Sequence, residues 1–287
     1  MFGRITSGIR IYTLIFLTLL TVAIWSVYLQ EPDDNLHVYF FDVGQGDAEL
    51  IQKGNYQLLV DGGPDNKIIE RLSSVMPIED REIEKIILTH PHADHLSGLN
   101  DILDRYKVDE IVYNEVTFDS NVYETFKSKI NQKKIKTKKP RAGSEEEIIS
   151  GIKIKYLWPD DNVDEYADNI NDTSIVFRLA DQNFSVLFTG DCETECWSGI
   201  LSGSESSSLK SNVLKVAHHG SDNGTTELML DKIKPAIAII SLGKDNKYGF
   251  PHQVATSLLQ KIGADIYRTD QKGTVDLKTD GYKISIE

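Results

Sequence analysis

Hydrophobic positions along the chain follow two different periods. Between residues 35 and 60, short runs of β-branched and aromatic residues are separated by turns that contain glycine, a pattern typical of paired strands. Further along, similar runs alternate with segments in which apolar residues recur every three or four positions, as they do at Leu96, Leu99 and Leu103. Strands that alternate with amphipathic helices predict an α/β layered domain.

The pattern predicts where these elements lie. Strands are expected at residues 37–43, 47–51, 56–60, 84–89, 109–113, 152–157, 174–179, 184–188, 213–217 and 235–241, with three more between 266 and 286. Helices are expected at residues 68–74, 96–106, 121–130 and 253–262. Residues 160–172 are acidic and rich in asparagine, which predicts an exposed loop with solvent-facing carboxylates, and the serine-rich residues 202–211 predict a flexible loop.

The first thirty residues form a separate segment. Residues 11–30 contain no charged side chain, and Arg4 and Arg10 precede them. A helix needs about 20 apolar residues to cross a bilayer, so the sequence predicts one transmembrane helix with its N-terminus inside and the body outside. A cleaved signal peptide is the alternative. We therefore expect a membrane anchor or signal segment at residues 1–30, and one extracytoplasmic domain at residues 31–287 of a single-pass cell-membrane protein.

Charge narrows the range of partners. Without the two arginines of the first segment, 29 basic and 44 acidic side chains remain, a net charge of −15. Such a body does not adhere broadly to nucleic acid, which requires a basic surface. Residues 127–141 are locally basic, and a solvated loop with an edge strand is the favoured interpretation over contact with an anionic substrate.

The chain has two cysteines, Cys192 and Cys196. An extracellular body permits a disulfide, but two cysteines four positions apart on an expected helix are poorly placed to form one. Free thiols and contacts close to a metal remain equally open.

Candidate chemistry is concentrated in residues 90–95, which lie between an expected strand and an expected helix. Three of the seven histidines in the chain fall here, His90, His92 and His95, together with Asp94. Imidazole nitrogens and carboxylate oxygens are ligands for divalent metals such as zinc and manganese. A turn directs side chains at this spacing towards a common point, so the sequence predicts a metal site. The alternative is a polar turn that caps the helix.

Other polar residues follow the ends of expected strands. Asp61, Asp191 and the pair His218 and His219 come directly after such strands, as the histidine motif does. We expect these strand ends to meet at one rim of a sheet, where sites of α/β proteins usually lie. His252 precedes an expected helix, whose N-terminus favours anions such as phosphate.

With these motifs in order, residues 35–287 resemble the metallo-β-lactamase superfamily, and more narrowly the metallo-hydrolase domain of ComEC-type competence proteins and their stand-alone relatives. The matching stretches are residues 41–47, 61–63, 90–95, 188–191, 218–221 and 248–252. The resemblance implies a four-layer αββα sandwich with a site for two divalent ions, Zn²⁺ or Mn²⁺, at one edge.

The resemblance also implies how the ligands divide. His90 and His92 would bind one ion, Asp94 and His95 the other, Asp191 would bridge them, and His218 or His219 would complete the second site. The superfamily often supplies a third histidine to the first ion, but none occurs between His95 and His218. Asn171 or Asp172 lies at about the matching place, so the first site is expected to be completed by an amide, a carboxylate or water.

Three residues would have catalytic roles by the same resemblance. Asp94 would orient the attacking hydroxide, Asp61 would support the metal-binding turn, and His252 would contact phosphate or protonate the leaving group. The expected activity is the hydrolysis of a phosphodiester, in nucleic acid or in a phosphate ester of the cell envelope, by a metal-activated water. The alternative is a non-catalytic accessory protein of DNA uptake or envelope assembly with a structural metal site. Hydrolysis of β-lactams is a third, less favoured possibility.

Overall fold

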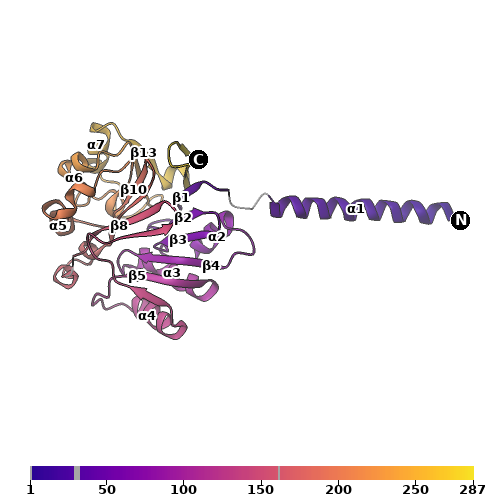
Figure 1. Cartoon of the computed structure of the whole chain (residues 1–287), viewed down its shortest axis with the longest axis horizontal. Coiled ribbons are helices and arrows are strands. Elements are labelled where there is room, and N and C mark those ends of the chain that lie inside the picture. The colour runs from indigo at the N-terminus through magenta and orange to yellow at the C-terminus, as the bar shows by residue number, and fades with distance from the viewer. Residues whose placement is uncertain (1, 29–32, 161) are drawn as a thin grey trace.

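The computed structural model of the protein describes residues 2–28, 33–160 and 162–287, and within the first helix it describes side chains for residues 10–22 and 25. Helix α1 (Phe2–Tyr28) extends away from the body (Figure 1). Its described apolar side chains are exposed, Phe16 by 64% and Trp25 by 59%. No helix in the described parts of the chain is both long enough and apolar enough to cross a membrane. The transmembrane helix predicted at residues 11–30, of which residues 29 and 30 lie outside the described part, is therefore not supported.

The body contains two β-sheets. The first has eight strands in the order β15 (Ile284–Ile286), β14 (Val275–Thr279), β1 (Leu36–Phe40), β2 (Glu49–Lys53), β3 (Tyr56–Val60), β4 (Glu82–Leu88), β5 (Lys107–Tyr113) and β6 (Lys136–Lys138). Strands β3 to β6 run parallel to one another, while β15, β14, β1, β2 and β3 pair antiparallel.

The second sheet has seven strands. Their order is β13 (Asp265–Arg268), β12 (Ile237–Ile240), β11 (Val213–Lys215), β10 (Phe184–Phe188), β9 (Val176–Asp181), β8 (Ile152–Trp158) and β7 (Glu145–Ile149). Strands β10 to β13 are parallel, and β7 to β10 pair antiparallel.

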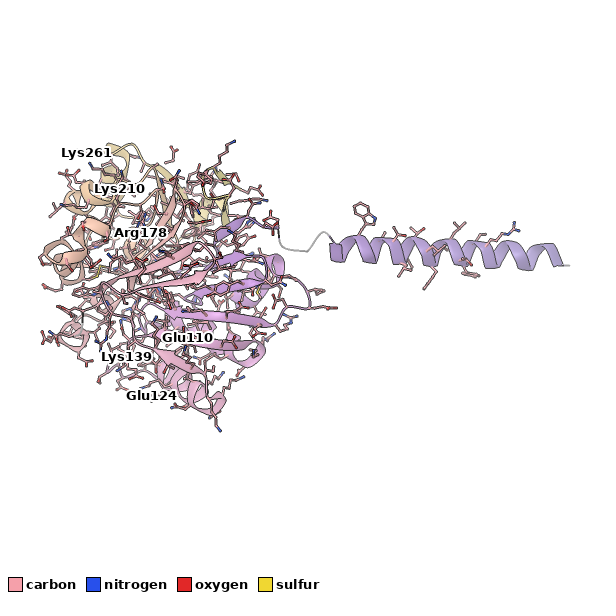
Figure 2. All side chains as sticks on the ribbon, in the orientation of Figure 1. Glu110, Glu124, Lys139, Arg178, Lys210 and Lys261 are labelled. Atoms are coloured by element: carbon pink, nitrogen blue, oxygen red, sulfur yellow. A yellow bond between two sulfur atoms is a disulfide. The ribbon has the colours of Figure 1, made fainter. Side chains whose placement is uncertain are left out.

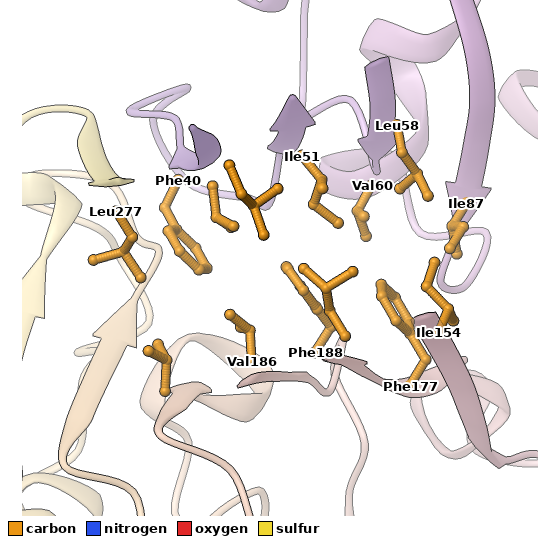
Figure 3. Packing of buried hydrophobic residues seen from close by; sticks show 14 of the residues in the cluster. Phe40, Ile51, Leu58, Val60, Ile87, Ile154, Phe177, Val186, Phe188 and Leu277 are labelled. Atoms are coloured by element: carbon orange, nitrogen blue, oxygen red, sulfur yellow. The ribbon is translucent and has the colours of Figure 1, made fainter. Parts of the chain in front are cut away.

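The inner faces of the two sheets pack against each other and form the central core (Figure 3). Because side chains alternate between the faces of a strand, every second residue of β1 points inward, and Phe40 is fully buried. Its ring lies 6.1 Å from that of Phe188, which in turn stacks on Phe177 at 4.7 Å. Apolar area buried between two sheets is the main stabilising contribution to such a fold.

Helices cover both outer faces. Helices α2 (Lys67–Val75), α3 (Ala93–Arg105) and α4 (Asn121–Lys133) share a second apolar cluster with the outer face of the first sheet. Helices α5 (Thr194–Ser202), α6 (Glu227–Ile233) and α7 (Gln253–Lys261) share a third with the second sheet, and the two groups lie on opposite sides of the body (Figure 1). A short helix, α8 (Thr269–Lys272), follows β13. The predicted four-layer αββα sandwich is confirmed.

Two expected loops contain helical turns. Residues 160–172 include the 3₁₀ helices Val163–Tyr166 and Ile170–Thr173, and residues 202–211 include Ser204–Ser208. The expected exposure was wrong for Asp172, which is only 2% exposed. Its carboxylate accepts backbone hydrogen bonds of 3.1 Å from Glu193 and Cys196 at the start of α5, which replaces the water that it would otherwise require.

The basic run of residues 127–141 is partly an edge strand, as predicted. Strand β6 lies at the edge of the first sheet. Lys136 pairs with Glu110, and Lys139 pairs with Glu115 at 2.8 Å. Acidic and basic side chains are interspersed in this region (Figure 2), so the run does not form a uniform basic patch.

Candidate metal centre

The turn after β4 directs the histidine motif into the protein. His90 follows β4, His92 is the N-cap of α3, and Asp94 and His95 lie in the first turn of that helix. The rings of His92 and His95 lie 4.8 Å and 4.2 Å from that of His90. The motif predicted from the sequence is therefore a compact cluster, in which His90 and His95 are fully buried.

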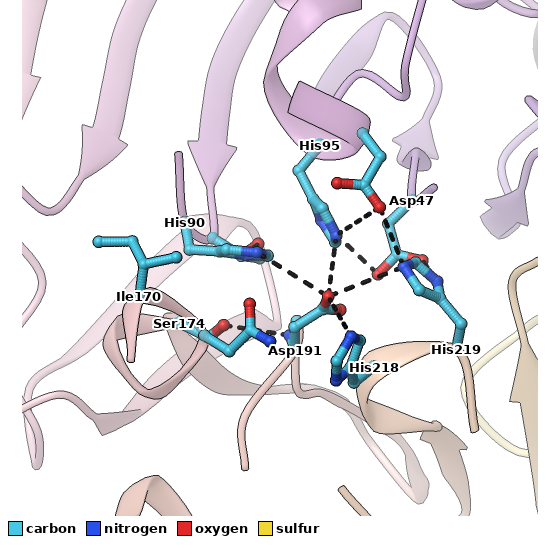
Figure 4. A network of polar contacts seen from close by, with 12 residues as sticks. Asp47, His90, His95, Ile170, Ser174, Asp191, His218 and His219 are labelled. Atoms are coloured by element: carbon cyan, nitrogen blue, oxygen red, sulfur yellow. Dashed lines mark hydrogen bonds and ion pairs between the residues drawn. The ribbon is translucent and has the colours of Figure 1, made fainter. Parts of the chain in front are cut away.

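Asp191 lies at the centre of this cluster (Figure 4). Its Oδ2 atom is 3.3 Å from Nε2 of His95, 3.7 Å from Nε2 of His219, and 3.8 Å from Nε2 of both His90 and His218. One carboxylate oxygen thus faces four imidazoles, the arrangement expected of a bridging ligand.

The backbone before Asp191 requires a glycine. Gly190 has φ +48°, and a Cβ atom there would lie 2.9 Å from the Cβ of Thr89. The amide of Asp191 donates to Oγ of Ser174 at 3.0 Å, which holds the turn after β10 in place. These contacts aim the Asp191 carboxylate at the end of β4.

Asp61 lies behind the centre. It follows β3 in the left-handed conformation (φ +55°) and accepts hydrogen bonds from the amide of Thr89 at 2.8 Å, from the Thr89 hydroxyl at 2.6 Å and from Nδ1 of His95 at 2.7 Å. Because Nδ1 of His95 donates to Asp61, the other ring nitrogen, Nε2, faces Asp191. This position suits the support of the turn rather than contact with reacting atoms, so Asp61 is a positioning residue here.

The two adjacent histidines have different surroundings. Both have positive φ, +47° for His218 and +53° for His219, and their ring planes are inclined at 65°. His219 donates from Nδ1 to the carbonyl of Ser241 at 2.9 Å, which turns Nε2 to the Asp94 carboxylate at 3.3 Å. His219 therefore belongs with Asp94 and His95, whereas His218 approaches Asp191 from another direction.

Three residues around these histidines were not predicted as site residues. Asp47 is 1% exposed, lies 3.3 Å from Nδ1 of His219 and pairs with the buried ammonium of Lys215. Glu193 bonds to Nδ1 of His218. The sequence does contain a signal for Lys215, since it is a single charge inside the apolar run of residues 213–217. Outer carboxylates of this kind fix the orientation of imidazole ligands.

Asn171 and Asp172, the residues expected in place of a middle histidine, lie in the 3₁₀ helix Ile170–Thr173. Asp172 is turned towards α5, as described above. Asn171 donates to Glu193 at 3.3 Å, and its buried Oδ1 has no hydrogen-bond partner among the described residues. Of the two, only Asn171 has an oxygen available.

His252 lies outside the cluster. It is the N-cap of α7, and its Nδ1 lies 3.2 Å from Oδ1 of Asp222. The ring of Phe250 stands between it and the centre, 5.0 Å from the ring of His252 and 5.3 Å from that of His218. The structure thus places His252 beside the centre without direct contact to Asp191.

Cys192 and Cys196 form a disulfide, contrary to the expectation from their spacing. Helix α5 begins at Thr194, so Cys192 precedes it in the turn after β10, and the two Cα atoms lie 5.5 Å apart. That separation is ordinary for a disulfide. The bond closes a loop that contains Glu193 and begins one residue after Asp191.

Burial and charge determine the protonation of the cluster. Burial lowers the pKa of His90 well below its usual value, and the neighbouring His95 lowers it further. Burial alone would also lower the pKa of His95. The negative charges of Asp191 and Asp61 have a larger effect and raise the pKa of His95 well above its usual value. Burial alone would raise the pKa of Asp191, yet His95 and His219 hold it well below its usual range.

The cluster fits a divalent metal. Nε2 of His90, Nε2 of His95 and Oδ1 of Asp191 are buried without a hydrogen-bond partner among the described residues, although buried polar atoms are normally paired. Groups of ligand atoms within 4.8 Å of one another include that of His90, His95 and Asp191 and that of Asp94, His95 and His219, and His95 belongs to both. Nitrogen and carboxylate donors in this arrangement suit zinc, manganese or iron.

Two packed sheets with outer helices and an imidazole–carboxylate centre at their strand ends define a metallo-hydrolase fold. The chain belongs to the metallo-beta-lactamase superfamily, whose profile matches residues 41–244. The resemblance read from the motifs is thereby confirmed.

Curated relatives lie among competence-type proteins. The chain is 31% identical over 203 residues to ComE operon protein 3 of Bacillus subtilis (strain 168), with 69% of this chain and 25% of that protein covered. It is 32% identical over 244 residues to Recombination protein 2 of Haemophilus influenzae, with 82% and 28% covered. The chain thus spans about a quarter of the length of these relatives.

A solved structure supports the fold. The metallo-beta-lactamase fold protein YhfI from Bacillus subtilis superposes with a TM-score of 0.55 at 14% identity, and covers 84% of this chain and 99% of its own. At that identity the likeness concerns the fold alone.

Proposed function

We propose that the chain is a phosphodiesterase that uses two divalent ions, Zn²⁺ or Mn²⁺, to hydrolyse a phosphate ester of nucleic acid or of the cell envelope. The convergence of four imidazoles on Oδ2 of Asp191 is the observation that supports this most strongly. His90, His95 and Asp191 form one group of possible ligands, and Asp94, His95 and His219 form another, so His95 is common to both and Asp191 lies close to each. The ring of His92 lies 4.8 Å from that of His90.

Different residues of the chain would orient the water, position the ligands and protonate the leaving group. When bound, a pair of ions lowers the pKa of a water and stabilises charge on the phosphoryl oxygens. Asp94, a third exposed, can accept a hydrogen bond from the attacking water and so orient it. Asp61 and Asp47 hold the rings of His95 and His219 in place. The predicted role of His252, to protonate the leaving oxygen, stays part of the proposal, and the ring of Phe250 lies next to those of both His252 and His218.

Metal loading tests this function. The purified chain, stripped with a chelator and reloaded with Mn²⁺ or Zn²⁺, is expected to hydrolyse bis(4-nitrophenyl) phosphate at least about a hundredfold faster than the stripped protein. Metal content is measured on the same samples. A protein that binds metal but leaves the diester intact under every loading would instead support a non-catalytic accessory protein with a structural metal site, and nitrocefin cleavage would support a β-lactam hydrolase.

An extracytoplasmic position for residues 31–287, held at the membrane by residues 1–30, stays part of the proposal. The names of the relatives, which include Competence protein ComA of Neisseria gonorrhoeae, favour a role in DNA uptake. The disulfide between Cys192 and Cys196 is consistent with an oxidising compartment. Protease added to intact cells is expected to degrade the body, and a body protected until the cells are lysed would contradict this location.

A further inference from the structure

A cavity of about 490 Å³ opens directly beside the metal centre. Its lining includes Asp94, so the cavity and the proposed reaction site share a residue. Gln45, Lys247 and Tyr248 line the same cavity. None of these three has a role in the chemistry described above.

Tyr248 presents a rigid, exposed ring in this cavity. It is 53% exposed and stacks on Phe250, with the ring centroids 5.6 Å apart and the planes 19° apart. Phe250 in turn lies 5.3 Å from the ring of His218 and 6.0 Å from that of His219. A series of rings thus leads from the metal centre to the surface.

The loop that carries Tyr248 is held in place. The side chain of Asn246 accepts hydrogen bonds from the amides of Tyr248 at 3.2 Å and Phe250 at 3.0 Å, and donates to the carbonyls of Gly243 and Phe250. Because the backbone is fixed, the ring of Tyr248 is already oriented before a ligand arrives, which reduces the entropy lost on binding.

Two polar groups accompany the ring. The ammonium of Lys247, an exposed residue, lies 5.1 Å from the centroid of the Tyr248 ring and so supplies a positive charge beside it. Gln45 accepts a hydrogen bond from the amide of Gly243, and its buried Nε2 has no hydrogen-bond partner among the described residues. A ring to stack on, a cation and an unpaired donor are the groups that a nucleotide requires.

On this basis we propose that the cavity lined by Gln45, Lys247 and Tyr248 binds a nucleobase of a nucleic-acid strand whose adjoining phosphodiester lies at the metal centre. The proposal rests on the phosphodiesterase function above and selects nucleic acid as its substrate class. Tyr248 stacks on the base, Lys247 pairs with a strand phosphate, and Gln45 donates to an oxygen of the base. The cation beside Tyr248 disfavours a choline head group, which would bring a second positive charge to the same ring. The net charge of −13 is compatible with this local binding, because stacking does not need a basic surface.

Binding of a phosphorothioate oligothymidylate, which resists hydrolysis, tests the proposal by fluorescence anisotropy. A phosphorothioate strand of equal length without bases is the control, because it keeps the backbone charge and removes the stacking. We expect Tyr248→Ala to weaken binding of the base-containing strand about tenfold and that of the base-free strand less than twofold. Tyr248→Phe, which keeps the ring, is expected to bind as the unaltered protein does. Lys247→Ala is expected to weaken binding of both strands and to reduce its salt dependence.

Tyr282→Ala and Lys283→Ala are the matched controls, because both residues are exposed at the turn between β14 and β15. Equal affinity of the unaltered protein for the two strands, or equal losses for both in Tyr248→Ala, would overturn the proposal. So would competition by poly(glycerol phosphate) that depends on Tyr248, which would assign the cavity to an envelope polymer. Base-dependent binding by a protein that does not cleave bis(4-nitrophenyl) phosphate would refute the phosphodiesterase function and leave the nucleobase subsite standing.

Discussion

Replacement of Asp191 by asparagine is expected to lower phosphodiesterase activity by about 10³-fold or more, because the charge stabilisation that metal ions supply is worth several kcal/mol and each 1.36 kcal/mol is tenfold in rate. Asparagine keeps the shape of the side chain but removes the charge of the oxygen that lies 3.3 Å from His95 and 3.8 Å from His90. Asp94 and the imidazoles would then have to hold the ions without the Asp191 carboxylate. The bound metal per chain is therefore expected to fall together with the rate.

The matched control is Asp231→Asn, the same chemical change on an exposed residue of α6. It is expected to retain full activity and metal content. Steady-state rates on bis(4-nitrophenyl) phosphate and elemental analysis of both variants make the comparison. If Asp191→Asn kept the metal and most of the activity, Asp191 would not be the bridging ligand, and the proposed assignment of ligands to two ions would be wrong.

Replacement of Lys215 by methionine is expected to lower the free energy of unfolding by about 3–5 kcal/mol, because it leaves a buried carboxylate without its partner. Lys215 and Asp47 are both almost fully buried and form an ion pair. Burial would raise the pKa of Asp47, but Lys215 lowers it, so Asp47 is ionised. Burial and the charge of Asp47 together raise the pKa of Glu49 well above normal.

Urea denaturation measures this change. Lys210→Met, a substitution of an exposed lysine, is expected to alter stability little. The double variant Asp47→Asn with Lys215→Met is expected to recover much of the loss, since removal of both charges leaves no unpaired ion. The double variant should still bind metal more weakly than the unaltered chain, because Asp47 no longer faces Nδ1 of His219. Equal stability of the single and double variants would show that the unpaired Asp47 carboxylate does not cause the loss.

Much of the fold could be predicted from the sequence because it depends on local pattern. Strands with one face in the core alternate, as Leu36, Val38 and Phe40 do in β1, and helices repeat every three to four residues, as α3 does. The assignment to the metallo-beta-lactamase superfamily was reached in the same way, from motifs in order along the chain. Element ends were predicted less well, since hydrogen bonds across the sheet decide them.

The errors have different physical causes. The exposure expected for Asp172 was wrong because its partners are amides of α5, more than twenty positions away. The spacing of Cys192 and Cys196 counted against a disulfide only on the assumption that both lie on one helix. The span predicted at residues 11–30 is a local inference that the described helix does not support.

By itself, the sequence determined the layered α/β architecture, the turn that holds His90 to His95, and the family to which the chain belongs. Only the tertiary structure decided that His219 joins Asp94 while His218 turns to Glu193, that Asp61 and Asp47 stand behind the ligands, and that Tyr248 lies beside the centre. The reason is physical. Periodicity and turns are set by neighbours in the chain, whereas the direction of a buried side chain is set by hydrogen bonds and charges from strands that only folding brings together.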